Sequence, residues 1–367
     1  MARFVCVDCG QEYPSERLPY LCPTCGGNFT IVDLAYDPIS KVDLPGMWAY
    51  QKMMGIGKNP VCYLGEGQTA LVKREAWNTQ FYAKLESLNP SGSFKDRNSA
   101  IVTSFLKARG IRNVVEDSSG NAGASLALYS AGFGIESQIF IPEGTTGTKL
   151  EQIIATGARV RPIAGVRENA HQAALAELEK GGVVYASHAM LPFGLAGYAT
   201  IAFEIFEQLG ELPARVYCPI GHGSLFFGVL LGFKAICKYL GVTSRPGMIG
   251  VQPERCAPLV SAWQKQPFTP GNLSSLAEGT MVEKPARGEE ILRELVPGQD
   301  NLLAIPEKDI DPVRLELARM GVYVEPTSAL VYAGLKMMAE TGRPNPHDDG
   351  INVLIFSGNG LKYRENK

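Results

Sequence analysis

The chain has 367 residues, with 35 lysines and arginines against 37 aspartates and glutamates. Single hydrophobic cores stop growing near about 250–300 residues, so this length predicts a body of two domains. The balanced charge argues against nucleic acid or an acidic membrane surface as partner, and it favours a small molecule. The first residues form no apolar leader, and the longest apolar run, Leu225–Ile236, contains Lys234 and is too short to cross a membrane. We therefore expect a cytoplasmic protein.

Four of the eight cysteines form two Cys-x2-Cys pairs, Cys6 with Cys9 and Cys22 with Cys25. Each pair can place two thiolates at the corners of a tetrahedron, and the residues between the pairs suffice for a small hairpin. Residues 1–33 therefore predict a zinc ribbon whose closed metal site is structural. Two disulfides or a redox site are the alternatives, and a cytosolic compartment disfavours the disulfides. The other four cysteines are scattered and are predicted to be buried and reduced.

Prolines and glycines interrupt residues 34–80, which predict a linker. From residue 81 onward, short β-rich runs alternate with helix-length segments. The predicted strands are 81–85, 113–116, 137–141, 159–163, 183–186, 216–219, 248–251 and 351–356. The predicted helices are 94–109, 122–133, 147–156, 168–181, 195–209, 224–240, 313–320 and 328–341. This alternation predicts an α/β fold with parallel or mostly parallel sheets covered by helices.

Loops that follow the strands are the candidate site, because ligands of open α/β sheets bind beyond the carboxyl ends of the strands. Three such loops are rich in small polar residues: 117–123 (Asp-Ser-Ser-Gly-Asn-Ala-Gly), 220–224 (Ile-Gly-His-Gly-Ser) and 357–360 (Ser-Gly-Asn-Gly). Glycines in the second loop allow backbone N–H groups to converge on an anion at a helix start. Each loop alone could also be an ordinary turn or a helix cap.

Residues 91–97, Ser-Gly-Ser-Phe-Lys-Asp-Arg, deliver Lys95 to the first turn of a predicted helix. Near the positive end of a helix and out of water, the ammonium form of a lysine is disfavoured, and its free amine can form a Schiff base with an aldehyde. A surface lysine beside Asp96 and Arg97 is the alternative.

These motifs occur in the order seen in pyridoxal-phosphate enzymes of fold type II, and within that group the chain resembles threonine synthase. Further segments are similar to motifs of that family: 64–69 (Leu-Gly-Glu-Gly-Gln-Thr), 324–329 (Val-Glu-Pro-Thr-Ser-Ala) and 360–362 (Gly-Leu-Lys). The resemblance covers about residues 60–365, and some members also carry an N-terminal zinc ribbon. With it we predict three parts: the ribbon 1–33, a large cofactor-binding domain formed by 34–97 and 200–367, and a smaller α/β domain, 98–199.

The resemblance implies a role for each site residue. Lys95 would hold pyridoxal phosphate as an aldimine and then act as general base and acid. Asn121 would hydrogen-bond the pyridoxal O3′, and Ser357 would face the pyridine nitrogen. The backbone of one loop would cradle the phosphate: Gly221, His222, Gly223, Ser224 and Leu225. The substrate would be bound by Ser118, Ser119, Gly120, Ala122 and Phe193.

One segment departs from the family. Threonine synthases hold the substrate phosphate partly with an Asn-Pro-x-Arg-x-x-Gly segment, whereas residues 191–197 read Leu-Pro-Phe-Gly-Leu-Ala-Gly. Leu191, Gly194 and Ala122 thus replace three polar partners of a phosphate, which predicts a less polar or differently charged substrate side chain.

The predicted function is elimination or replacement on the side chain of an α-amino acid. A genuine threonine synthase acting on O-phosphohomoserine is the first alternative, with phosphate contacts from Lys149, Arg167 or His222. A zinc-ribbon adaptor with an inactive enzyme-like body is the alternative from a different class, and intact Lys95, Asn121 and Ser357 argue against it. The family resemblance favours a homodimer.

Overall fold

The computed structural model describes residues 2–57, 59–269, 274–341 and 350–364. The chain divides into two compact units, which are taken in turn. The first unit contains residues 1–67, 89–200 and 362–367, and the second contains residues 68–88 and 201–361. The helix α5 (Phe193–Leu209) begins in the first unit and ends in the second.

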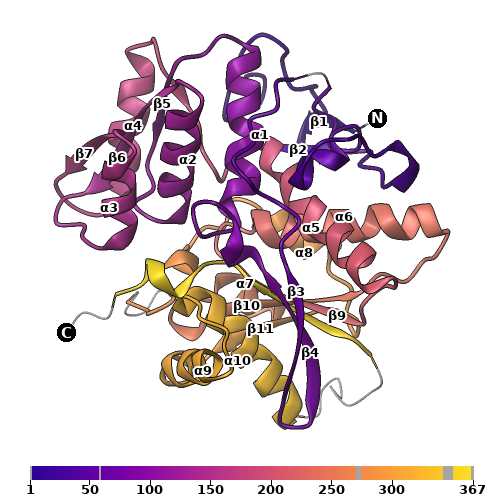
Figure 1. Cartoon of the computed structure of the whole chain (residues 1–367). Helices are drawn as coiled ribbons and strands as arrows, with labels where there is room; N and C mark the ends of the chain where they lie inside the picture. Colours follow the sequence, from indigo (N-terminus) through magenta and orange to yellow (C-terminus); the bar gives the residue numbers. More distant parts are fainter. Residues whose placement is uncertain (1, 58, 270–273, 342–349, 365–367) are drawn as a thin grey trace. The chain divides into compact units, whose positions relative to one another are not determined.

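The first unit is built around a four-stranded parallel sheet with the order β7-β6-β5-β8. Its strands are β5 (Asn113–Glu116), β6 (Glu136–Pro142), β7 (Arg159–Ile163) and β8 (Val184–Tyr185). Its helices are α1 (Lys95–Ala108), α2 (Asn121–Gly132), α3 (Thr148–Ala155) and α4 (Arg167–Glu179), and Figure 1 shows the last three around the sheet. Successive residues of β6 face opposite sides: Phe140 packs with α4, whereas Ile139 and Ile141 pack with α2 and α3.

Residues 1–67 also belong to the first unit. The strand β1 (Arg3–Cys6) pairs antiparallel with β2 (Phe29–Val32), so the two Cys-x2-Cys segments belong to one small hairpin module. The prediction of a linker over residues 34–80 is wrong. Met47 and Trp48 are fully buried in the short helix η2 (Gly46–Tyr50), because single helical turns between the glycines and prolines still present apolar side chains to the core.

The second unit contains a six-stranded sheet with the order β11-β10-β9-β12-β4-β3. The strands are β3 (Leu71–Ala76), β4 (Thr79–Leu85), β9 (Arg215–Pro219), β10 (Gly247–Pro253), β11 (Asn301–Ile305) and β12 (Asn352–Phe356). All neighbouring strands are parallel except β3, which pairs antiparallel with β4.

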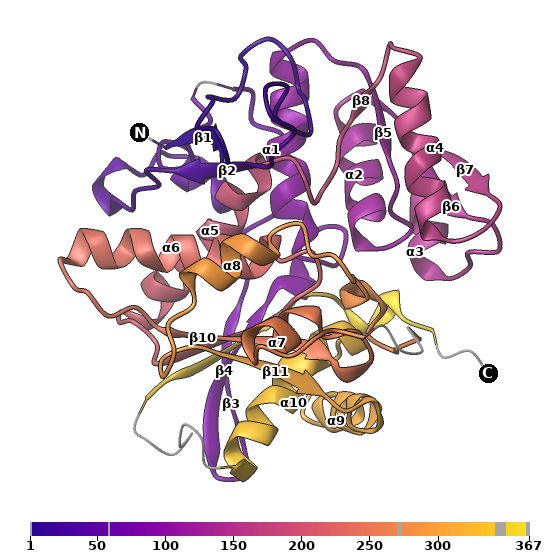
Figure 2. The ribbon, with the colours of Figure 1, turned by 180° about the vertical axis from the view of Figure 1, so that it is seen from behind.

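Helices cover both faces of this second sheet. Figures 1 and 2 show α9 (Glu307–Arg319) and α10 (Pro326–Thr341) on the opposite side from α6 (Ser224–Leu240) and α8 (Gly288–Glu294). The short α7 (Pro258–Trp263) completes the helices of the unit. Side chains of α9 and α10 form one large apolar cluster with Tyr217, Val251 and Leu354 of the sheet. The prediction of an α/β fold with mostly parallel sheets is confirmed.

Two details differ from the sequence-based expectation. The strands β3 and β11 and the helices α7 and α8 were not predicted. Residues 34–67 and 89–97 lie in the same compact unit as the four-stranded sheet, although we assigned them to the cofactor-binding domain. The domain boundaries stay a prediction. Across the described residues, every helix is too short or too polar to cross a membrane.

Candidate active site

Lys95 is the first residue of α1 and is half-buried. Burial lowers its pKa to about 8; the Glu116 carboxylate opposes this change, and Arg167 reinforces it. The neighbouring Asp96 carboxylate is engaged elsewhere, since it accepts hydrogen bonds from the backbone N–H of Ser91 at 2.6 Å and from two serine hydroxyls. At a pKa of about 8, a larger share of this lysine is free amine at neutral pH than is the case for a solvated surface lysine.

The loop from Ser118 to Gly120 follows β5 and leads directly into α2, which begins at Asn121. The Ser118 hydroxyl accepts a hydrogen bond from the Gly120 N–H at 3.3 Å, which tightens the turn. Ser118 is buried, whereas Ser119, Gly120 and Asn121 are half-buried. The first N–H groups of a helix have no partner within the helix, so this loop can bind a carboxylate.

Phe193, the predicted substrate residue farthest from this loop in the sequence, has no exposed surface. Its ring stacks on Phe105 with the centroids 3.8 Å apart, and the rings of Phe4 and Tyr13 meet it edge-on at 5.0 and 4.8 Å. Phe193 is therefore a packing residue between α1, α5 and the N-terminal hairpin. A role at the substrate stays a prediction without support from this geometry.

In the second unit, the predicted phosphate loop lies between β9 and α6. Gly223 has φ of 93°, in the left-handed region, and a Cβ on it would come within 2.6 Å of Ile291. The N–H of Arg287 donates to the His222 carbonyl oxygen at 2.9 Å, which fixes the turn. The start of the long helix α6 at Ser224 then presents unused backbone N–H groups, which fit a phosphate.

Ser357 follows β12 in the same unit and is fully buried. Its hydroxyl lies 3.0 Å from that of Ser328, which also accepts a hydrogen bond from the Gly358 N–H at 2.7 Å. A neutral hydroxyl held in this way can face a ring nitrogen without fixing a proton on it.

Two buried pairs at the carboxyl end of β5 were not predicted from the sequence. Glu116 Oε1 lies 2.7 Å from Nδ1 of His188, and both side chains are buried. The next residue, Asp117, accepts a hydrogen bond from the Tyr185 hydroxyl at 2.5 Å and lies 3.2 Å from Nδ1 of His171. The signal was present, since Glu116 and Asp117 stand directly before Ser118 where a strand ends.

The pKa values of these groups follow from their surroundings. Burial raises the pKa of Glu116 well above its ordinary value, and it lowers the pKa of His188 well below its own. Burial alone would raise the pKa of Asp117, but hydrogen bonds from His171 and Tyr185 lower it, so this carboxylate stays ionised.

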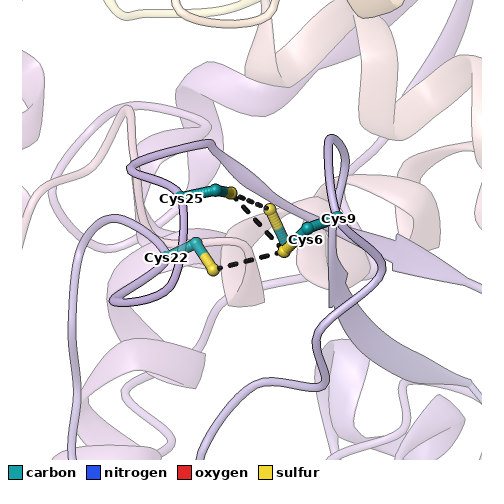
Figure 3. A group of neighbouring side chains, drawn as sticks. All are labelled: Cys6, Cys9, Cys22 and Cys25. Atoms are coloured by element: carbon teal, nitrogen blue, oxygen red, sulfur yellow. Dashed lines mark hydrogen bonds between the residues drawn. The ribbon is translucent and has the colours of Figure 1, made fainter.

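The four predicted metal ligands come together in the N-terminal module, as Figure 3 shows. Their Sγ atoms all lie within 4.8 Å of one another, with Cys6 and Cys25 3.4 Å apart and Cys9 and Cys22 3.7 Å apart. Four thiolates around a tetrahedral zinc, with Zn–S bonds of about 2.3 Å, have their sulfurs roughly 3.8 Å apart. The donor set and its spacing therefore fit zinc.

Comparison with known proteins gives a consistent result. Residues 62–358 match the model of a family described as pyridoxal-phosphate dependent enzyme. Threonine synthase from Methanosarcina acetivorans is 31% identical over 99% of this chain and 92% of its own length. Threonine synthase from Methanocaldococcus jannaschii is 31% identical over 97% of this chain and 92% of its own length.

Solved structures give the same fold. Maize serine racemase superposes with a TM-score of 0.69 at 22% identity, covering 80% of this chain and 88% of that one. Serine racemase from Dictyostelium discoideum superposes with a TM-score of 0.67 at 21% identity, covering 79% of this chain and 92% of that one.

Proposed function

The chain belongs to the family of pyridoxal-phosphate-dependent enzymes, as a lyase or synthase of fold type II, and we propose that it eliminates or replaces a group on the side chain of an α-amino acid. The observation that carries this proposal is Lys95, a half-buried lysine at the start of α1 whose pKa is about 8. When bound, the cofactor draws electrons from the substrate's α-carbon, which makes the α-proton and a side-chain leaving group labile.

The proposed roles come from the family resemblance, and the local geometry is compatible with them. In the first unit, Lys95 would hold the cofactor through its aldehyde and would move the α-proton at its Nζ, while N–H groups of residues 118–121 would hold the substrate carboxylate. Asn121 would donate a hydrogen bond to the cofactor. In the second unit, the N–H groups of residues 221–225 would bind the phosphate, and the Ser357 hydroxyl would be a neutral partner for the cofactor ring.

The substrate side chain is proposed to differ from a phosphate ester. A Cβ at position 194 would collide with the side-chain oxygen of Asn98, so an arginine there would have to displace the buried Asn98 side chain. Leu191 and Ala122 are buried and apolar, and neither can donate a hydrogen bond to a phosphate from its side chain.

A second candidate is threonine synthesis from O-phosphohomoserine. It is favoured by one observation, the alignment of the two threonine synthases with 97–99% of the chain. The phosphate contacts would then have to come from cationic or histidine side chains outside residues 191–197.

The test is a spectral and product screen of the cofactor-loaded protein. We expect a visible absorbance band in the wild type and in Lys107→Ala, a change of an exposed lysine on the same helix, and its loss in Lys95→Ala. Amino acids with hydroxyl, acyl and phosphate leaving groups are then compared by release of ammonia, 2-oxo acid or leaving group. Absence of the band from the wild type would contradict the proposed enzymatic function. Release of phosphate and threonine from O-phosphohomoserine would establish the second candidate.

We also propose that Cys6, Cys9, Cys22 and Cys25 bind a structural zinc ion, because four thiolates at this spacing leave no open coordination position. We further propose that the protein is a cytoplasmic homodimer without nucleic-acid or membrane partners. The family resemblance supports the dimer.

A further inference from the structure

The Glu116–His188 pair is the feature of the first unit that the proposed function leaves unused. Glu116 is the last residue of β5, and His188 follows β8, the strand that pairs in parallel with β5. Figure 2 shows these two strands side by side, with α4 next to them. Parallel strands end at the same edge of a sheet, and this edge carries the Ser118–Asn121 loop.

The pair is built rigidly. Besides the contact of 2.7 Å between Oε1 and Nδ1, Glu116 Oε2 accepts a hydrogen bond from the His188 backbone N–H at 3.3 Å. The carboxyl group is 1% exposed, so it is held in one orientation and is shielded from water. When it is ionised, a carboxylate this deeply buried acts strongly on other charges near it, because the local dielectric is low.

Lys95 lies near this edge: the next residue, Asp96, accepts a hydrogen bond from the Ser125 hydroxyl, which places the start of α1 against the first turns of α2, the helix that begins directly after the Ser118–Gly120 loop. The Glu116 carboxylate raises the pKa of Lys95 against the effect of burial, and Lys95 in turn lowers the pKa of Glu116. The other charged or titratable groups that act on this trio come from the end of β5, from β8 and from α4: Asp117, Tyr185, Arg167 and His171. Asp117 is hydrogen-bonded to Tyr185 and lies against His171, and Glu116 is the carboxyl group at this edge whose charge acts on Lys95.

We propose that Glu116 and His188 are positioning residues for Lys95: the carboxylate is the counter-charge of the lysine nitrogen, and the imidazole holds the carboxylate in place. This inference rests on the proposed role of Lys95. When the substrate amine displaces the lysine from the cofactor, the counter-charge determines how readily Lys95 holds the proton that it takes from the α-carbon. Because burial raises the pKa of Glu116, its carboxyl group loses its proton at a higher pH than an ordinary glutamate does, and the counter-charge is present only above that pH.

The test is a pH titration of the visible band of the cofactor-loaded protein. Glu116→Gln keeps the shape of the side chain and removes the charge, so we expect the midpoint to move to lower pH by about one unit or more. His188→Ala removes the imidazole that holds the carboxylate and should move the midpoint in the same direction. His188→Asn can still donate to Glu116 and should restore the wild-type midpoint.

Glu136→Gln is the matched control, since Glu136 is an exposed carboxylate at the start of β6 in the same sheet. Its midpoint should equal that of the wild type. An unchanged midpoint in Glu116→Gln overturns the inference while leaving the proposed function intact, whereas a wild type without any band contradicts the proposed function itself. If circular dichroism shows that Glu116→Gln does not fold, His188→Ala and His188→Asn are compared instead. Equal titration midpoints in these two variants would overturn the inference.

Discussion

The pKa of Lys95 leads to a quantitative prediction for the capture of the cofactor. Only the free amine attacks an aldehyde, and burial lowers the pKa of this lysine from 10.5 to about 8. At pH 7 such a lysine is about one tenth free amine, whereas an ordinary lysine is about 0.03% free amine, a difference of about 300-fold. The capture rate should therefore rise about tenfold between pH 6 and 7 and level off above pH 8, since the amine fraction grows with pH only up to the pKa.

The assay mixes cofactor-free protein with pyridoxal phosphate in a stopped-flow instrument and follows the visible band at a series of pH values. Lys107→Ala should give the wild-type profile, because Lys107 is an exposed lysine near the other end of α1. Lys95→Ala should give no band. A profile that keeps rising toward pH 10.5, or equal capture by Lys95→Ala, would refute the reasoning, since either result means that a lysine other than a buried Lys95 reacts.

Three further changes test other parts of the molecule. Gly223→Ala forces a side chain into a left-handed turn and against Ile291, so the affinity for the cofactor in an absorbance titration should fall roughly tenfold. Gly241→Ala, at the open far end of α6, should leave the affinity unchanged. Equal losses of affinity in both variants would contradict the role of the Gly223 turn in phosphate binding. Cys22→Ser should lower the zinc content per chain, measured by atomic emission. An unchanged zinc content would refute the proposed zinc site. Phe193→Ala should lower the free energy of unfolding in urea by about 3–5 kcal/mol, and a loss below about 1 kcal/mol would mean that its aromatic cluster does not stabilise the unit.

The parallel sheets could be predicted because each strand is short and apolar and each crossover is long enough for a helix. The strand β3 was missed for a local reason. Its sequence, Leu-Val-Lys-Arg-Glu-Ala, is only partly apolar, and the turn that joins it to β4 places Trp77 and Asn78 at positive φ. Asparagine is common in such a turn, but tryptophan is not, so the hairpin carried a weak signal.

The candidate site was only partly predictable. Lys95 and the loop after β5 carry contiguous motifs, and these can be recognised in a single sequence. The pair of Glu116 and His188 joins residues 72 positions apart, and it exists because β5 and β8 are neighbours in the sheet. No short pattern contains that information, since the order of strands in a sheet is a tertiary property.

The departure of residues 191–197 from the threonine synthase segment can be explained as a change of packing. Leu191 is 2% exposed, Phe193 is fully buried against Phe105 and the N-terminal hairpin, and Gly194 lies so close to Asn98 that any larger residue would collide. A segment whose side chains are directed into the interior cannot also present them to a charged ligand. Recognition of the substrate side chain must then come from other residues. The carboxyl end of β5 supplies polar side chains of another kind, Asp117 and the Glu116–His188 pair, and a carboxyl group there disfavours an anionic phosphate ester and suits a neutral or cationic substrate side chain.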